Sequence, residues 1–144
     1  MDPIQLLFSF QGRIGRAQYW LAVLIYFIAA AIVFVIDYFV PSYTAMIVVA
    51  LLLYVPCLIS SIGVGIKRLH DRNKSSWWLL LFYLGPLLAF SAASLLDGGT
   101  VASALSIAGF VILIWSIVEL GALRGSIEAN PYGPDPVAPK PAQH

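Results

Sequence analysis

The residues best suited to chemistry lie in one basic stretch at positions 67–78, KRLHDRNKSSWW. His70 and Asp71 could act as a general base and the carboxylate that orients it, but side chains adjacent in sequence rarely point at each other. No serine or cysteine is placed as a nucleophile beside them, and one histidine with one aspartate supplies too few ligands for a metal ion. We therefore predict no catalytic site, no metal site and no cofactor.

The same stretch suits the recognition of lipid headgroups, because anionic lipid at the inner leaflet attracts each nearby cation by about 1 kcal/mol. A basic loop also sets the orientation of a membrane protein, and tryptophans anchor at membrane interfaces. We predict a polar cluster at one membrane surface that serves either lipid headgroups or the structure itself. Its members are Arg13, Arg16, Arg68, His70, Asp71, Arg72 and Lys74, with Tyr19, Trp20, Trp77 and Trp78 as interfacial anchors.

Two carboxylates have distinct expected roles. Asp71 is the only acidic residue in the segments that form the cluster, so we expect it to be the counter-ion of the arginines, gripped by one of them through two parallel hydrogen bonds. Glu119 is the only ionisable residue near the interior of an apolar run. It precedes Arg124 by about one helical turn, so we expect it to reach the interface or pair with a cation rather than serve a proton relay.

Four charge-free runs must position these residues, at 17–36, 38–66, 75–96 and 98–118. The chain has 144 residues, of which 60% are hydrophobic and 10% charged, and its mean hydropathy is +0.89. An apolar helix of about 20 residues crosses the hydrocarbon of a bilayer. This composition excludes a soluble enzyme domain, a disordered chain and a disulfide-stapled secreted domain, and the single cysteine, Cys57, excludes an intramolecular disulfide. The net charge of +1 gives no case for nucleic-acid binding.

The continuous apolarity of these runs favours helices over the alternating strands of a β-barrel. We predict an all-α membrane protein with four transmembrane helices and a short N-terminal interfacial helix, begun by Asp2 and Pro3. Small residues at Ser61, Gly63 and Gly65 predict the close approach of another helix. The expected organisation is an N-terminal segment at 1–15, a transmembrane domain at 16–123 with spans at about 16–36, 43–68, 77–96 and 101–123, and a proline-rich tail at 124–144 that we expect to be disordered.

The basic residues predict the orientation of the chain in the membrane. All 8 lysines and arginines precede the first span, separate the second from the third, or follow the fourth. The other two turns contain Asp37 and Asp97 and no basic residue. The positive-inside rule therefore places both termini and the central loop in the cytoplasm.

Three blocks of this sequence resemble the domain of unknown function 805 family of small bacterial inner-membrane proteins: FQGRIGRAQYW at 10–20, RLHDRNKSSWW at 68–78 and GSIEANPYGPDP at 125–136. The blocks stand in the right order and the resemblance covers nearly the whole chain. The chain departs from the family pattern at Gly15 and Gln18, where the family usually has Ser and Glu. It departs again at Ser76, where the family usually has Gly, and at Pro131, where the family often has a basic residue. The resemblance implies a multi-pass protein of the bacterial inner membrane, and it implies no reaction.

Three functions remain open. The first is a non-enzymatic module whose basic cytoplasmic face binds anionic lipid headgroups or a partner protein. The second is a small oligomeric transporter or flippase, for which the span centres offer only hydroxyls, Cys57 and two prolines. The third is a membrane enzyme acting on lipid headgroups through His70 and Asp71. The expected partners are membrane lipids, anionic ones among them, and either further copies of the chain or another membrane protein.

Overall fold

The computed structural model describes residues 2–40 and 42–137. Helices make up most of this part, and it contains no named strand, only one isolated bridge between Asn130 and Gly133. The elements are α1 (Pro3–Phe8), α2 (Arg16–Phe39), α3 (Tyr43–Asp71), α4 (Trp78–Ser94), α5 (Gly99–Ile117) and a π-helical turn, η1 (Val118–Ala122), that continues α5. The all-α prediction is confirmed.

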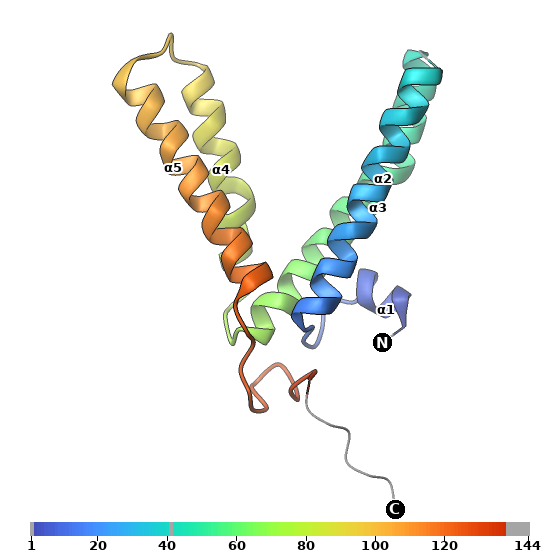
Figure 1. The fold of residues 1–144 in the computed structure, drawn as a ribbon, viewed down its shortest axis with the longest axis vertical. Helices are drawn as coiled ribbons and strands as arrows, with labels where there is room; N and C mark the ends of the chain where they lie inside the picture. Colours follow the sequence, from blue (N-terminus) through green and yellow to red (C-terminus); the bar gives the residue numbers. More distant parts are fainter. Residues whose placement is uncertain (1, 41, 138–144) are drawn as a thin grey trace, which may run out of the picture.

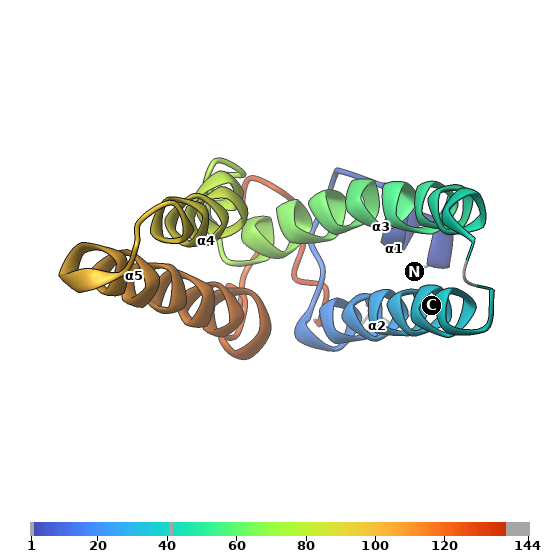
Figure 2. The ribbon, with the colours of Figure 1, turned by 90° about the horizontal axis from the view of Figure 1, so that it is seen from above.

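The long helices form two hairpins that diverge like the arms of a V (Figure 1). α2 packs on α3, and α4 packs on α5. Among the described residues the two hairpins touch only through the contacts of α3 with α4 and of η1 with α2 and α3. Seen from above, α2 and α3 lie on one side and α4 and α5 on the other (Figure 2). We call the closed end of the V, where α3 ends and α2 begins, the basic end.

The helices have the length and composition of membrane spans. Three stretches are long and apolar enough to cross a membrane, namely Arg16–Phe39, Tyr43–Asp71 and Gly99–Ala122. α4 is apolar but shorter, with 17 residues, or about 25 Å of helix. Large apolar side chains are exposed along all four helices, as expected where lipid surrounds them. The chain is therefore a helical membrane protein with about four spans.

Helix α3 is longer than the sequence indicated, and this changes the setting of the polar residues. It runs to Asp71 rather than ending at Arg68, so His70 and Asp71 lie in its last turn and not in a loop. At the start of α2 the Gly15 N–H donates to Gln18 Oε1 at 3.2 Å, which is one of the two bonds of a capping box. Helical backbone therefore positions Arg16, Arg68, His70 and Asp71. Arg13 precedes α2, and Arg72 and Lys74 follow α3.

The small residues of α3 allow other elements to approach closely. A Cβ on Gly65 would lie 2.6 Å from Leu79 Cδ1, so α4 packs directly on the backbone of α3 at this point. A Cβ on Gly63 would lie 3.1 Å from the carbonyl oxygen of Ser9, just after α1. The close approach predicted from these residues is confirmed.

Helix α1 lies against α2 and α3 at the basic end (Figure 1). Asp2 caps it by accepting a hydrogen bond from the Ile4 N–H at 3.4 Å, as predicted. At its other end the buried amine of Lys67 donates to the carbonyl oxygens of Gln5 and Leu6 at 2.9 and 2.5 Å. These carbonyls belong to the last turn, where helical partners run out, although the Gln5 oxygen also accepts from the Ser9 N–H at 3.3 Å. Lys67 thus fastens α1 to α3, and the interfacial location of α1 stays a prediction.

Candidate functional site

Asp71 forms the centre of the basic end. Its Oδ1 accepts hydrogen bonds from Arg13 Nε at 3.2 Å and Arg13 Nη2 at 3.0 Å, and its Oδ2 accepts one from Arg68 Nη1. The three side chains are at most 3% exposed. One arginine grips the carboxylate through two hydrogen bonds, as expected, but both bonds from Arg13 end on Oδ1, and Arg68 takes Oδ2. One carboxylate is therefore shared by two buried cations.

Arg13 connects this centre to the C-terminal segment. Its remaining N–H groups donate to the carbonyl oxygens of Ser126 at 2.7 Å, Glu128 at 2.8 Å and Gly133 at 3.1 Å. A guanidinium carries five N–H donors. All of them have acceptors here, so Arg13 holds residues 126–133 against the helix ends.

The C-terminal segment makes further contacts with the last turn of α3. The Ser126 N–H donates to the Asp71 carbonyl at 2.8 Å, and Asn130 Nδ2 donates to the His70 carbonyl at 2.8 Å. The ring of Tyr132 stacks on the His70 ring with a centroid distance of 3.8 Å. The predicted disordered tail is therefore wrong for residues 125–137, whereas residues 138–144, with Lys140, lie outside the described residues.

Gly125 lets this segment reach Asp71. A Cβ at this position would lie 2.0 Å from Asp71 Oδ2 and 2.4 Å from its Cγ. Real Cβ atoms do not approach other atoms so closely, so the present arrangement requires glycine here. The sequence signal was the glycine that opens the third block of the family resemblance, but no pattern within the chain connected it to Asp71.

The end of η1 presents four successive carbonyl groups to side chains from α2 and α3. Such groups at a helix C-terminus have no partner within the helix. Arg68 donates to the oxygens of Leu120, at 2.6 Å from Nε, and of Leu123. Trp20 Nε1 donates to the Gly121 carbonyl at 3.1 Å. Arg16 Nη1 donates to the Ala122 carbonyl at 3.2 Å. The cations of the first two blocks thus cap the last helix and close the V.

Glu119 forms a second centre. Its Oε1 lies 3.1 Å from Arg72 Nε and 3.0 Å from Lys74 Nζ, and its side chain is 5% exposed. Lys74 Nζ also lies 4.9 Å from the centre of the Trp78 ring. The expected pairing with a cation is confirmed, with Arg72 and Lys74 as the partners. The carbonyl oxygen of Arg124 joins this centre by accepting from Arg72.

His70 does not form the catalytic pair considered from the sequence. Its Nε2 lies 3.0 Å from Ser76 Oγ, and its Nδ1 is buried with no hydrogen-bond partner in the described residues. The carboxylate oxygens of Asp71 accept from Arg13 and Arg68 instead. The described residues also contain no group of three histidine, cysteine or acidic residues that could hold a metal ion.

The predicted aromatic anchors divide into two groups. Trp77 is 77% exposed and Trp20 is 48% exposed, so both are open to a surrounding interface. Tyr19 is half-buried against the core, and Trp78 packs edge-on against Trp115 with ring centroids 5.4 Å apart. The first group has the exposure that an interfacial anchor needs, whereas the second contributes to packing.

One polar pocket lies at the basic end, between the start of α2 and the segment after η1. We call it the arginine pocket. It has a volume of about 110 Å³. Its lining residues are Gly15, Arg16, Arg68, Asp71, Arg124, Gly125, Asp135 and Val137.

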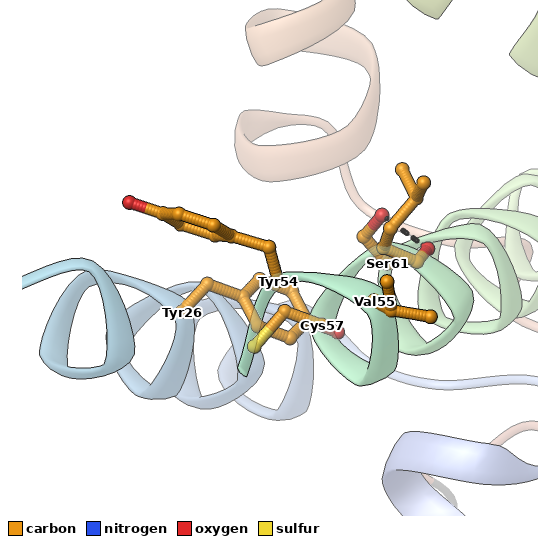
Figure 3. A pocket seen from close by; sticks show the side chains of 6 residues that line it. Tyr26, Tyr54, Val55, Cys57 and Ser61 are labelled. Atoms are coloured by element: carbon orange, nitrogen blue, oxygen red, sulfur yellow. Dashed lines mark hydrogen bonds between the residues drawn. The ribbon is translucent and has the colours of Figure 1, made fainter. Parts of the chain in front are cut away.

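The other hollows are apolar and lie along the helices. One of about 410 Å³ is lined by residues of α2 and α3, and Figure 3 shows Tyr26 beside Cys57 in it. Another of about 610 Å³ lies between α3 and α4, with Phe82 and Leu87 among its lining residues. Neither is lined by a charged residue. The arginine pocket therefore has a different chemistry from these two.

Comparisons with known proteins agree with this architecture. The model of a family described as a protein of unknown function, DUF805, matches residues 7–134. The uncharacterized protein YiiR of Escherichia coli K12 is 30% identical over 133 residues, covering 91% of this chain and 88% of that protein. The inner membrane proteins YhaI and YhaH of the same organism are 35% identical over 79 residues and 28% identical over 82 residues, each covering 53% of this chain and 63% and 64% of their own lengths. No solved structure matches the chain.

Proposed function

This chain belongs to the DUF805 family, and we propose that it is a non-enzymatic membrane module whose basic end faces the cytoplasm and binds anionic lipid headgroups. The observation that carries the proposal is an excess of positive charge at the basic end. All seven lysines and arginines of the described part of the chain lie there. The two turns at the opposite end contain Asp37 and Asp97 and no lysine or arginine.

The excess is reduced but persists, since seven described cations face five acidic residues at this end, namely Asp2, Asp71, Glu119, Glu128 and Asp135. Asp71 is shared by Arg13 and Arg68, and Glu119 is shared by Arg72 and Lys74, so each centre retains one positive charge. Lys67 bonds to carbonyl oxygens alone. Charges held in a low-dielectric setting are poorly screened. The basic end therefore projects a positive potential toward the depth at which headgroups lie, and anionic lipid is its natural counter-ion.

The structure divides the roles of the arginines. Arg13 and Arg68 are buried and bonded to Asp71 and to backbone carbonyls, so they support the fold. Arg16 and Arg124 are exposed. We assign headgroup contact to this exposed pair, because only these side chains of the four are accessible to a lipid.

The test is lipid selectivity in a defined bilayer. The protein is placed in nanodiscs of phosphatidylcholine and phosphatidylglycerol in equal amounts, and native mass spectrometry counts the lipids it retains. We expect several-fold enrichment of the anionic lipid, which falls as salt rises because the contacts are exposed. Equal retention of the two lipids would contradict the proposal.

The orientation has its own test. Topology reporters fused after Asn73 and after Gly98 should read cytoplasmic and external, respectively. A reporter at Asn73 that reads external would place the basic end at the outer surface and contradict this part of the proposal.

A further inference from the structure

We infer that the arginine pocket binds a phosphate group, either that of an anionic phospholipid or inorganic phosphate, between the side chains of Arg16 and Arg124. This inference rests on the proposed function and narrows it to one site. The pocket lies where α2 begins and α3 ends. Both are span ends on the same side, so the pocket lies at headgroup depth.

The size of the pocket suits one small anion. Its volume of about 110 Å³ equals roughly three to four water molecules at about 30 Å³ each. A single phosphate group fits this space, whereas a sugar ring or a peptide does not. A lipid would therefore place only its phosphate inside and leave its glycerol and acyl chains along the helices.

Two exposed arginines supply the donors. Arg16 spends one N–H on the Ala122 carbonyl at 3.2 Å, which leaves four donors of its guanidinium for a ligand. The side chain of Arg124 forms no hydrogen bond or ion pair within residues 2–40 and 42–137. The planar guanidinium fork matches two phosphate oxygens at once. Two such forks at one pocket are a chelating arrangement for a phosphate.

The wall of the pocket is positively charged as well. Arg68 lines it at 0% exposure and makes three hydrogen bonds within the described part of the chain, although a guanidinium has five donors. Its carboxylate partner, Asp71, is shared with Arg13. Arg68 is therefore a buried cation with unused N–H donors and a carboxylate that it shares with a second cation, and this favours an anion beside it.

The start of α2 adds to this preference. Gly15 is the N-cap and lines the pocket, and it has no side chain to accept from the first-turn N–H groups. The N-cap therefore gives these N–H groups no side-chain partner. The positive end of the helix dipole favours an anion at this point.

Two carboxylates line the pocket, Asp71, which is paired with Arg13 and Arg68, and Asp135, which opposes an anion there. The carboxylate of Asp135 accepts from the Val137 N–H at 2.9 Å and lines the pocket together with the arginines. It repels a phosphate and weakens binding. This opposition yields a test in the reverse direction, because its removal should strengthen phosphate binding.

The experiment compares variants of the full-length protein. Arg16→Gln with Arg124→Gln removes both ligand forks, and Asp135→Asn removes the opposing charge. Lys74→Gln is the control, because it deletes one cation at the same end while Arg72 keeps Glu119 paired. All of these side chains are at least partly exposed. Arg16→Gln removes one exposed bond to the Ala122 carbonyl, but Trp20 and Arg68 still bond to the end of η1, so circular dichroism and the elution profile should match those of the parent protein.

Two readouts distinguish the sources of the phosphate. In detergent, a titration with inorganic phosphate, with chloride as the ionic-strength control, reports the pocket alone. In mixed nanodiscs, retained phosphatidylglycerol reports the lipid. The affinity is compared for whichever phosphate source the parent protein binds. We expect the double variant to lose at least tenfold in this affinity and Lys74→Gln to change it less than threefold. Asp135→Asn should increase it.

The outcomes separate this inference from the proposed function. If the parent protein enriches anionic lipid and the double variant enriches it equally, the pocket assignment is wrong and the proposed function stands. If the parent protein binds inorganic phosphate through these arginines but shows no lipid preference, the pocket stands and the proposed function is wrong. A phosphate response that chloride reproduces, with no effect of the double variant on lipid, overturns the inference.

Discussion

Replacing Asp71 by asparagine tests whether the shared carboxylate holds the basic end together. The substitution preserves the shape of the side chain and removes its charge. One oxygen still accepts from one arginine, but the new NH₂ group faces the donors of the other, since Arg13 and Arg68 each take one oxygen in the parent protein. Two buried guanidinium groups then lack any carboxylate.

The expected loss is large because the three side chains are at most 3% exposed. Removing one partner of a buried ion pair costs about 3–5 kcal/mol, since the remaining charge stays buried without compensation. For a chain of this length each kcal/mol lowers the melting temperature by about 3 °C, so the decrease should be about 9–15 °C. The carbonyl partners of both arginines remain, which keeps the loss within this range rather than above it.

Thermal unfolding in a single detergent, followed by circular dichroism, measures the effect. Asp37→Asn is the matched control, because Asp37 is exposed near the opposite end of the helices. It should change the melting temperature by no more than about 2 °C. Equal losses in the two variants would refute the reasoning. Recovery of Asp71→Asn on adding anionic lipid would show that the arginines serve headgroups and not the fold.

Three other substitutions test separate contacts, and a fourth serves as a control for the first. Gly125→Ala must displace the Asp71 carboxylate, which its Cβ would meet at 2.0 Å, and should cost at least about 2 kcal/mol. Gly15→Ala, whose Cβ meets only a side-chain atom at 3.5 Å, should cost less than about 1 kcal/mol, and similar melting temperatures for the two would contradict the close approach. Glu119→Gln should cost about 1–2 kcal/mol in thermal unfolding, less than Asp71→Asn, because its cationic partners are 24% and 29% exposed. No change in its melting temperature would mean that this centre is not formed. Lys67→Met should speed hydrogen exchange in α1 with little change in global melting, and unchanged exchange there would rule out the lysine as its anchor.

The helices followed from sequence because their determinants are local. Four apolar runs each reach the length of about 20 residues that a bilayer requires, and no tertiary contact is needed to make such a run helical in lipid. Capping residues such as Asp2 and Gln18 act within three positions of themselves, so the starts of α1 and α2 can be read from the sequence as well. Asp71 could be assigned to the arginines because residues 10–20 and 68–78, which supply the cluster, contain no other carboxylate.

Tertiary structure decided the partners of the charged groups. Arg13 bonds to carbonyl oxygens at Ser126, Glu128 and Gly133. Every residue has a carbonyl group, so nothing in the side-chain pattern marks these three as acceptors. The C-terminal segment was expected to be disordered for the same reason. Its polar, proline-rich composition shows that it has few apolar side chains to bury, but it does not show that its backbone carbonyls accept hydrogen bonds from Arg13.

Tertiary structure also decided the partners of Glu119 and the burial of two arginines. Glu119 and Arg72 are 47 positions apart, and they meet only because η1 packs on α3. Burial depends on which element covers a side chain, and the cover over Arg13 and Arg68 comes from η1 and residues 123–133. The sequence alone therefore determined where the positive charge gathers, through the local alternation of apolar runs and basic turns. Only the packing of distant segments decided which cations support the fold and which remain exposed to a ligand.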